Sequence, residues 1–175
     1  YSTAVGYLAL SYDTTGGENS AFGTQASERN TTGVYNLSCG QYALRFNQTG
    51  SYNTAVGSNA LSTATAGSSG TAVGHNSLTS TTSGSINTAV GRDSLKLNTT
   101  GDYNTSVGGY SLDANTTGSN NVAVGYDSLS GNTTGTKNVA MGYEASLGNV
   151  DKTENVAIGH QALRSTGSSW STAVG

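Results

Sequence analysis

Two histidines, His75 and His160, are the residues of this chain best suited to bind a metal or transfer protons. Each directly follows a glycine of a series spaced by seventeen residues, and five such intervals separate them. If each interval forms one coil of stacked β-structure, the two imidazoles lie about 24 Å apart at the ordinary strand spacing. They cannot share a metal ion within one chain, so we interpret both as solvent-facing side chains.

Asp127 and Glu144 occupy equivalent positions in successive intervals, and paired carboxylates can bind calcium or act as acid and base. No nucleophile, partner base or aspartate-rich loop accompanies them, and the sequence has no phosphate-binding loop or CxxC motif. Lys137 and Glu154 share a slot one interval apart, which predicts an exposed ion pair. We therefore expect no enzyme, no catalytic residue, no cofactor and no metal site.

Cys39, the single cysteine, cannot form a disulfide within the chain. It fills a slot that holds valine in other copies, which predicts a small buried apolar side chain. The net charge of −3 gives no reason to expect nucleic acid as a partner. No run of about 20 apolar residues is present, so membrane insertion of this segment is not expected either.

The periodic glycine is the strongest structural signal in the chain, because a fixed short period indicates one unit stacked on copies of itself. The series comprises Gly6, Gly23, Gly40, Gly57, Gly74, Gly91, Gly108, Gly125, Gly142 and Gly159, with Gly175 after a shorter interval. No apolar face with helical spacing persists. The sequence predicts an all-β fold, a parallel β-solenoid (β-roll) of about ten seventeen-residue coils forming one domain over residues 1–175. Because the chain starts within a repeat, we expect it to be part of a longer fibrous protein.

Each coil reads approximately N-T-A-V-G-Y-x-A-L-x-x-N-T-T-G-x-Y, with short strands expected at N-T-A-V and around A/S-L. The residue before the periodic glycine is apolar in every copy and is expected to face inward, with a second apolar column four residues after it. This predicted core comprises Val5, Cys39, Val56, Val73, Val90, Val107, Val124, Met141, Ile158, Leu61, Leu78, Leu95, Leu112 and Leu129. Two residues before the glycine only Ala or Ser occurs, which indicates a close approach. The period loosens over residues 146–167, where an altered corner or a bulge is expected.

Asparagine recurs four residues before the periodic glycine. The column comprises Asn19, Asn36, Asn53, Asn87, Asn104, Asn121, Asn138 and Asn155, interrupted by Gly70. Stacked amides can form a hydrogen-bonded ladder along the axis, or each asparagine can bond its own turn. Both interpretations give these residues a structural role.

Tyrosines are the main surface signal, and five occupy outward-facing slots: Tyr35, Tyr52, Tyr103, Tyr126 and Tyr143. Exposed aromatic rings can stack on sugars or pack against a partner protein, although tyrosine also suits a half-exposed strand. Asn-x-Ser/Thr triplets begin at Asn30, Asn36, Asn47, Asn98, Asn104, Asn115 and Asn132. Most arise automatically from the T-T-G corner, so the triplets alone do not establish glycan attachment there.

One coil offers few apolar side chains, so a single chain is expected to be underpacked and to associate as a homotrimer. The segments N-T-A-V-G-x-x-A-L at 53–61, N-V-A-V-G-Y-x-S-L at 121–129 and N-V-A-I-G-H-x-A-L at 155–163 resemble head repeats of trimeric autotransporter adhesins and repeats of phage tail-fibre proteins. The resemblance implies a left-handed parallel β-roll, a homotrimer, and a place outside the cell, on a cell surface or on a virion tail.

The function expected on these grounds is that of an extracellular structural and adhesive fibre segment that attaches to cells, glycans or other surfaces. Two alternatives remain: an ice-binding β-solenoid, and a subunit of a self-assembling extracellular filament.

Overall fold

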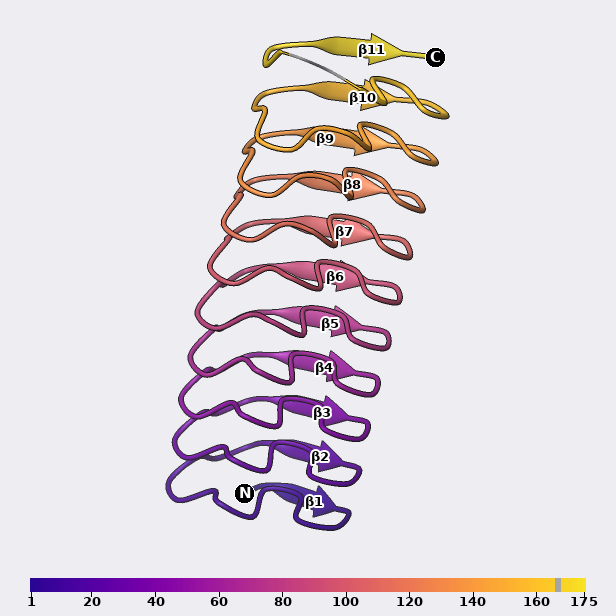
Figure 1. Cartoon of the computed structure of the whole chain (residues 1–175). Helices are drawn as coiled ribbons and strands as arrows, with labels where there is room; N and C mark the ends of the chain where they lie inside the picture. Colours follow the sequence, from indigo (N-terminus) through magenta and orange to yellow (C-terminus); the bar gives the residue numbers. More distant parts are fainter. Residues whose placement is uncertain (166–167) are drawn as a thin grey trace.

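The computed structural model describes residues 1–165 and 168–175. The chain forms a stack of parallel coils that runs from the N-terminus to the C-terminus (Figure 1). Each coil contributes one three-residue strand to a single parallel sheet in sequential order. The strands are β1 (Thr3–Val5), β2 (Ser20–Phe22), β3 (Leu37–Cys39), β4 (Thr54–Val56), β5 (Thr71–Val73), β6 (Thr88–Val90), β7 (Thr105–Val107), β8 (Val122–Val124), β9 (Val139–Met141), β10 (Val156–Ile158) and β11 (Thr172–Val174). The all-β parallel solenoid predicted from the period is confirmed.

Pairing between coils keeps one register along the stack: Ala55 pairs with Ala72, and Ala72 pairs with Ala89. The last pair differs, because Val156 of β10 pairs with Thr172 of β11 after an interval one residue shorter. The parallel ladder thus continues past the irregular segment expected at 146–167, of which residues 166 and 167 lie outside the described residues. No helix long and apolar enough to cross a membrane occurs among the residues described.

The periodic glycine is required by both backbone conformation and space. Gly57 has a φ of +131°, and a Cβ atom there would lie 2.6 Å from the carbonyl oxygen of Gly74 in the next coil. A side chain would therefore clash with backbone that cannot move independently. Because this contact recurs once in every coil, glycine recurs every seventeen residues in the sequence.

The segment around A/S-L forms consecutive turns, so the second strand expected there is wrong. Asn59 and Leu61 have φ values of 58° and 50°, in the left-handed region. The Ala60 N–H donates to Gly57 O at 3.3 Å within the coil, whereas the Leu61 N–H donates to Ser77 O of the next coil at 3.0 Å. Satisfied backbone groups offset the cost of this conformation for non-glycine residues, and the same φ pattern recurs along the rod.

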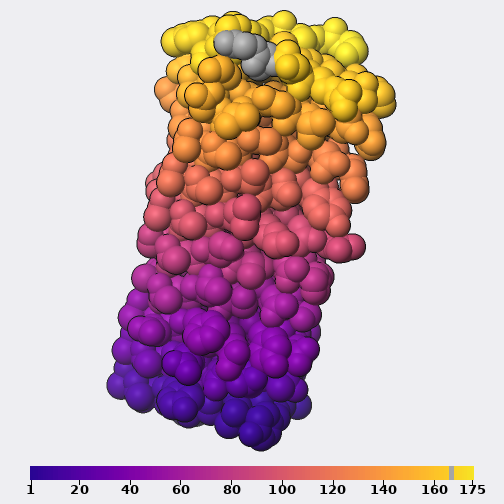
Figure 2. Space-filling model, in the orientation of Figure 1, coloured from indigo at the N-terminus to yellow at the C-terminus, as the bar shows by residue number. Residues whose placement is uncertain are grey.

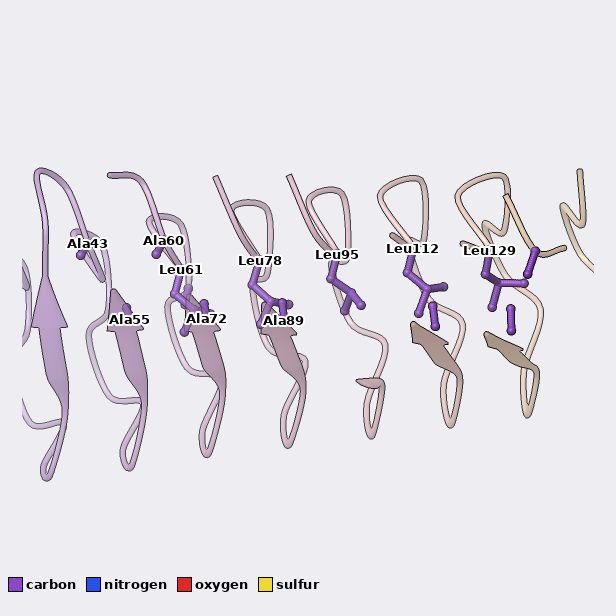
Figure 3. Close-up of a cluster of buried hydrophobic side chains, with 14 of the residues drawn as sticks. Ala43, Ala55, Ala60, Leu61, Ala72, Leu78, Ala89, Leu95, Leu112 and Leu129 are labelled. Atoms are coloured by element: carbon purple, nitrogen blue, oxygen red, sulfur yellow. The ribbon is translucent and has the colours of Figure 1, made fainter. Parts of the chain in front are cut away.

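The core lies between the strand and the turn segment opposite it, where leucine side chains point toward the alanines of the sheet (Figure 3). Leu78, Leu95 and Leu112 are fully buried, as are Ala72 and Ala89 in the middle of their strands. The two walls are so close that a leucine from one wall leaves room only for Ala or Ser on the other. The successive coils close into a continuous rod (Figure 2).

The prediction that the residue before each periodic glycine faces the core is wrong for the single chain. A strand alternates its side chains, and the buried middle residue turns the residues on either side of it outward. The predicted inward residues Val5, Cys39, Val73, Val107, Met141 and Ile158 are exposed, and Val56, Val90 and Val124 are half-buried. The leucines Leu61, Leu78, Leu95, Leu112 and Leu129 of the same prediction are buried. Cys39, expected to be buried, is an exposed thiol.

The asparagines four residues before the glycine join coil to coil. The Oδ1 atom of Asn36 accepts the backbone N–H of Asn53 at 3.0 Å, and its Nδ2 atom donates to Gly50 O at 2.9 Å. Farther along, Asn121 Nδ2 also donates to Asn104 Oδ1 at 3.2 Å. The eight side chains, Asn19, Asn36, Asn53, Asn87, Asn104, Asn121, Asn138 and Asn155, are 3% exposed or less. The structure therefore has the axial ladder, directed mainly to the backbone of the next coil.

A second asparagine ladder, not inferred from the sequence, precedes the T-T-G corner. Asn115 Nδ2 donates to Asn98 Oδ1 at 2.8 Å and to Gly118 O of its own corner at 3.0 Å. The column comprises Asn30, Asn47, Asn98, Asn115, Asn132 and Asn149, all buried. Its signal in the sequence is the recurrence of Asn three residues before the corner glycine, which also generates most of the Asn-x-Ser/Thr triplets.

Candidate interaction surface

The outer face of the parallel sheet extends along all eleven strands of the stack. Two columns of side chains point outward from it, one on each side of the buried middle residue of every strand. The first column is Thr3, Ser20, Leu37, Thr54, Thr71, Thr88, Thr105, Val122, Val139, Val156 and Thr172. The second is Val5, Phe22, Cys39, Val56, Val73, Val90, Val107, Val124, Met141, Ile158 and Val174. We call these two columns the sheet face.

The sheet face contains no charged residue in any of its eleven strands. Phe22 is 41% exposed, Met141 42% and Ile158 39%, so large apolar side chains reach solvent along most of its length. Monomeric proteins seldom leave a continuous apolar surface uncovered, and such surfaces are typical of interfaces. The threonine and valine side chains are β-branched and stiff, so ordering them against a partner costs little entropy. The face is chemically suited to pack against another surface.

The exposed tyrosines form short stacks along the rod. The rings of Tyr35 and Tyr52 lie 5.2 Å apart with 10° between their planes. Tyr143 stacks between Tyr126 at 5.9 Å and His160 at 5.3 Å. Tyr143 has a stacked ring on each side, so it presents mainly its edge and hydroxyl group to a ligand.

Tyr103, the remaining tyrosine proposed for surface binding, is 57% exposed. His75 and His160 are both solvent-facing, as their variable slot predicted. His160 belongs to the tyrosine stack whereas His75 lies five coils away, so the structure does not bring the two imidazoles together.

The surroundings of Asp127 and Glu144 shift the pKa values of both carboxyl groups, in opposite directions. Partial burial, together with the neighbouring carboxylate of Glu144, raises the pKa of Asp127. Hydrogen bonds from Tyr143 and then Gln161 lower the pKa of Glu144, and Gln161 Nε2 lies 2.9 Å from its Oε2 atom. Across residues 1–165 and 168–175, no group of three or more His, Cys, Asp or Glu side chains is arranged to hold a metal ion.

The predicted ion pair is present, with 3.3 Å between Lys137 Nζ and Glu154 Oε1. Both residues are at the surface, so the pair contributes at most about 1 kcal/mol.

The Asn-x-Ser/Thr triplets are not accessible for glycan attachment in the folded chain. Their asparagines are Asn30, Asn36, Asn47, Asn98, Asn104, Asn115 and Asn132, and each belongs to one of the two ladders and is 3% exposed or less. Attaching a glycan to Nδ2 would replace a buried hydrogen bond with a group too large for the core. Glycan attachment at these positions, which the sequence leaves open, is therefore incompatible with the packing of the folded chain.

No family model, curated protein or solved structure matches this chain. The candidate surface therefore rests on its own geometry: an uncharged sheet face along all strands, short aromatic stacks, and a rod whose interior is filled by asparagine, alanine and leucine.

Proposed function

We propose that this chain is a segment of an extracellular attachment fibre, in which three copies pack through their sheet faces. The observation that carries the proposal is the uncharged outward face, which extends over every strand of the stack. Covering it would bury the valine column that the single chain leaves in water. The resemblance of the repeats to trimeric adhesin heads and tail-fibre repeats supports the same assembly.

The rest of the rod then serves attachment. A stiff trimer displays each surface feature three times at fixed spacing, so weak contacts with a cell or glycan surface combine into firm binding. Attachment of this kind depends on repeated non-covalent contacts and requires no acid–base residues.

Cys39 provides a direct test, because the single thiol lies on the sheet face. We expect a trimer in sedimentation equilibrium, and we expect a short bis-maleimide to link Cys39 thiols of different chains. Val90→Glu with Val124→Glu places two charges on the face and should give a folded monomer. Thr117→Glu, at an exposed corner, is the matched control and should stay trimeric. A wild-type chain that sediments as a monomer at high concentration and gives no cross-link contradicts the proposed assembly.

Attachment itself needs a separate measurement. Beads carrying the trimer should adhere to cells or glycan-coated surfaces more strongly than beads carrying the Val90→Glu, Val124→Glu monomer at equal chain density. Equal, background-level adhesion of both would contradict the adhesive function while leaving the trimer intact.

Ice binding is the second candidate, and one structural observation favours it. Thr54, Thr71, Thr88 and Thr105 are in register on four successive strands of the sheet face, although Leu37 and Val122 end this run. Such an array can order water only if it remains uncovered. Inhibition of ice recrystallisation by wild type, lost in Thr88→Lys, would favour this candidate, whereas inactivity would remove it.

A further inference from the structure

A shallow depression of about 200 Å³ lies near the N-terminal end of the rod, away from the residues of the sheet face. Its lining comprises Tyr12, Arg29, Thr31 and Gln48, which come from three successive coils. Tyr12, Arg29 and Gln48 are exposed and Thr31 is half-buried, so the polar groups are accessible from solvent.

One guanidinium group lines the depression, and it forms no ion pair among the described residues. Two arginines contact the ring of Phe46, with Arg29 Cζ 5.2 Å and Arg45 Cζ 4.8 Å from its centroid. Arg45 is neutralised by Glu28, whose Oε2 atom is 2.7 Å from Arg45 Nε. Arg29 forms no ion pair within the described part of the chain. Stacking on Phe46 orients the planar guanidinium group of Arg29, which can then pair with an anion.

The available donors favour a carboxylate on a sugar over a phosphate. The backbone N–H groups of Thr31, Thr32 and Gly33, which together resemble an anion-binding corner, all donate to Gln48 O. A phosphate therefore finds no free backbone donors there, whereas a guanidinium fork pairs with the two oxygens of a carboxylate. Tyr12 offers an exposed ring edge and hydroxyl, and the Gln48 side-chain amide can exchange hydrogen bonds with sugar hydroxyls.

We infer that this depression binds the carboxylate of an acidic sugar residue, with Arg29 as the pairing group and Tyr12 and Gln48 as contacts to the ring and its hydroxyls. Thr31 Oγ1 donates to Gln48 O at 2.8 Å, so it can only accept a hydrogen bond from the ligand. The inference rests on the proposed attachment function, for which it names the ligand class as acidic glycans. A trimer would carry three such depressions.

The test is a titration of the full chain, followed by NMR or calorimetry, with the trisaccharide of galacturonic acid as the probe. Its methyl ester is the neutral control of the same shape. Loss of a charge-assisted pair should weaken binding of the acid about tenfold in Arg29→Ala. Arg29→Lys should also bind more weakly, because it retains charge but loses the fork. Arg164→Ala, which removes an exposed arginine paired with Glu144 near the other end of the rod, should bind as wild type.

Binding of the acid but not the ester, with the loss confined to Arg29 and Tyr12→Ala, supports the inference. Equal binding of acid and ester, no binding of either, unchanged affinity in Arg29→Ala, or displacement by equimolar inorganic sulfate overturns it. Each variant changes an exposed side chain, and its thermal unfolding is compared with wild type. Adhesion of the trimer that persists in Arg29→Ala would overturn only this site. A monomeric, non-adhesive wild type that still binds the acid would overturn only the proposed function.

Discussion

At the scale of single residues, the buried amides set the stability of the rod, and one missing amide leaves two polar atoms without partners. Ala64 occupies a slot of the second asparagine ladder, and next to it Asn47 Oδ1 and Thr81 Oγ1 are buried and unpaired. In Ala64→Asn the new Nδ2 can donate to Asn47 and the new Oδ1 can accept from Thr81. We expect an increase of about 1 kcal/mol in the free energy of unfolding, measured by urea denaturation.

Ala66→Asn is the control for that change, because it adds the same side chain at an exposed position of the same corner. Its midpoint should stay within error of wild type. A lower midpoint for Ala64→Asn would show that the coil cannot accept the amide at this rung.

The periodic glycines give the opposite prediction. Gly57→Ala places a methyl group against the Gly74 carbonyl at a positive φ, so we expect a loss of at least about 2 kcal/mol or failure to fold. Gly17→Ala is the matched control, since a Cβ atom at Gly17 meets no other atom within 4 Å. Thermal unfolding should separate the two variants clearly. Similar melting temperatures would contradict the explanation of the period given above.

Asp127 predicts a dependence of stability on pH. Burial and the Glu144 carboxylate raise its pKa in the folded chain, so its ionised form is less favourable in the folded than in the unfolded state. The resulting cost is full above the raised pKa and disappears as pH falls below the ordinary value of 3.8. Asp127→Asn should therefore stabilise the fold at pH 7 and lose this advantage near pH 3, as urea midpoints at both pH values would show. An advantage that is constant with pH would contradict this cause.

At the scale of the coil, the sequence predicted the repeat correctly but not the direction of its side chains. The period, the corner glycine and the leucine column follow from spacing alone, because each copy must meet the next at the same place. The hydrophobicity of the valine column predicts that it faces inward, whereas the alternation of side chains along a strand places it opposite the small Ala or Ser residues. In the N-T-A-V strand, Asn and Ala share one face, and Thr and Val share the other. The Asn and Ala side chains, such as Asn53 and Ala55, are the buried ones. The turns at A/S-L were missed because leucine rarely adopts positive φ.

Residues 58–91 lack asparagines at positions of both ladders. Gly70 interrupts the first ladder, while Ala64 and Thr81 interrupt the second, although Leu61 and Leu78 continue the leucine column. In a linear stack, stability is approximately a sum of contacts between neighbours, so the rod should open first here. We expect backbone amides of residues 58–91 to exchange hydrogen at least about tenfold faster than those of residues 105–141, as measured by mass spectrometry. Asn104→Ala, which breaks the intact region, should remove much of this difference by loosening the slower coils. Uniform exchange in wild type would contradict the prediction.

At the scale of the whole molecule, the rod is a set of interchangeable rungs, and this makes it tolerant of one kind of deletion. Removing residues 105–121 joins Asn104 to Val122 and restores the ladder, the strand and the leucine column in register, because these two segments are one full period apart. The shortened chain should fold, with the slope of its urea unfolding reduced roughly in proportion to the lost rung. Removing residues 105–113 instead joins Asn104 to Ala114, which places turn residues where β7 should pair with β6 and β8. That chain should unfold or aggregate, because a strand that pairs out of register exposes its core face. Equal stability of the two deletions, by circular dichroism and urea titration, would mean that the coils are not held by their register.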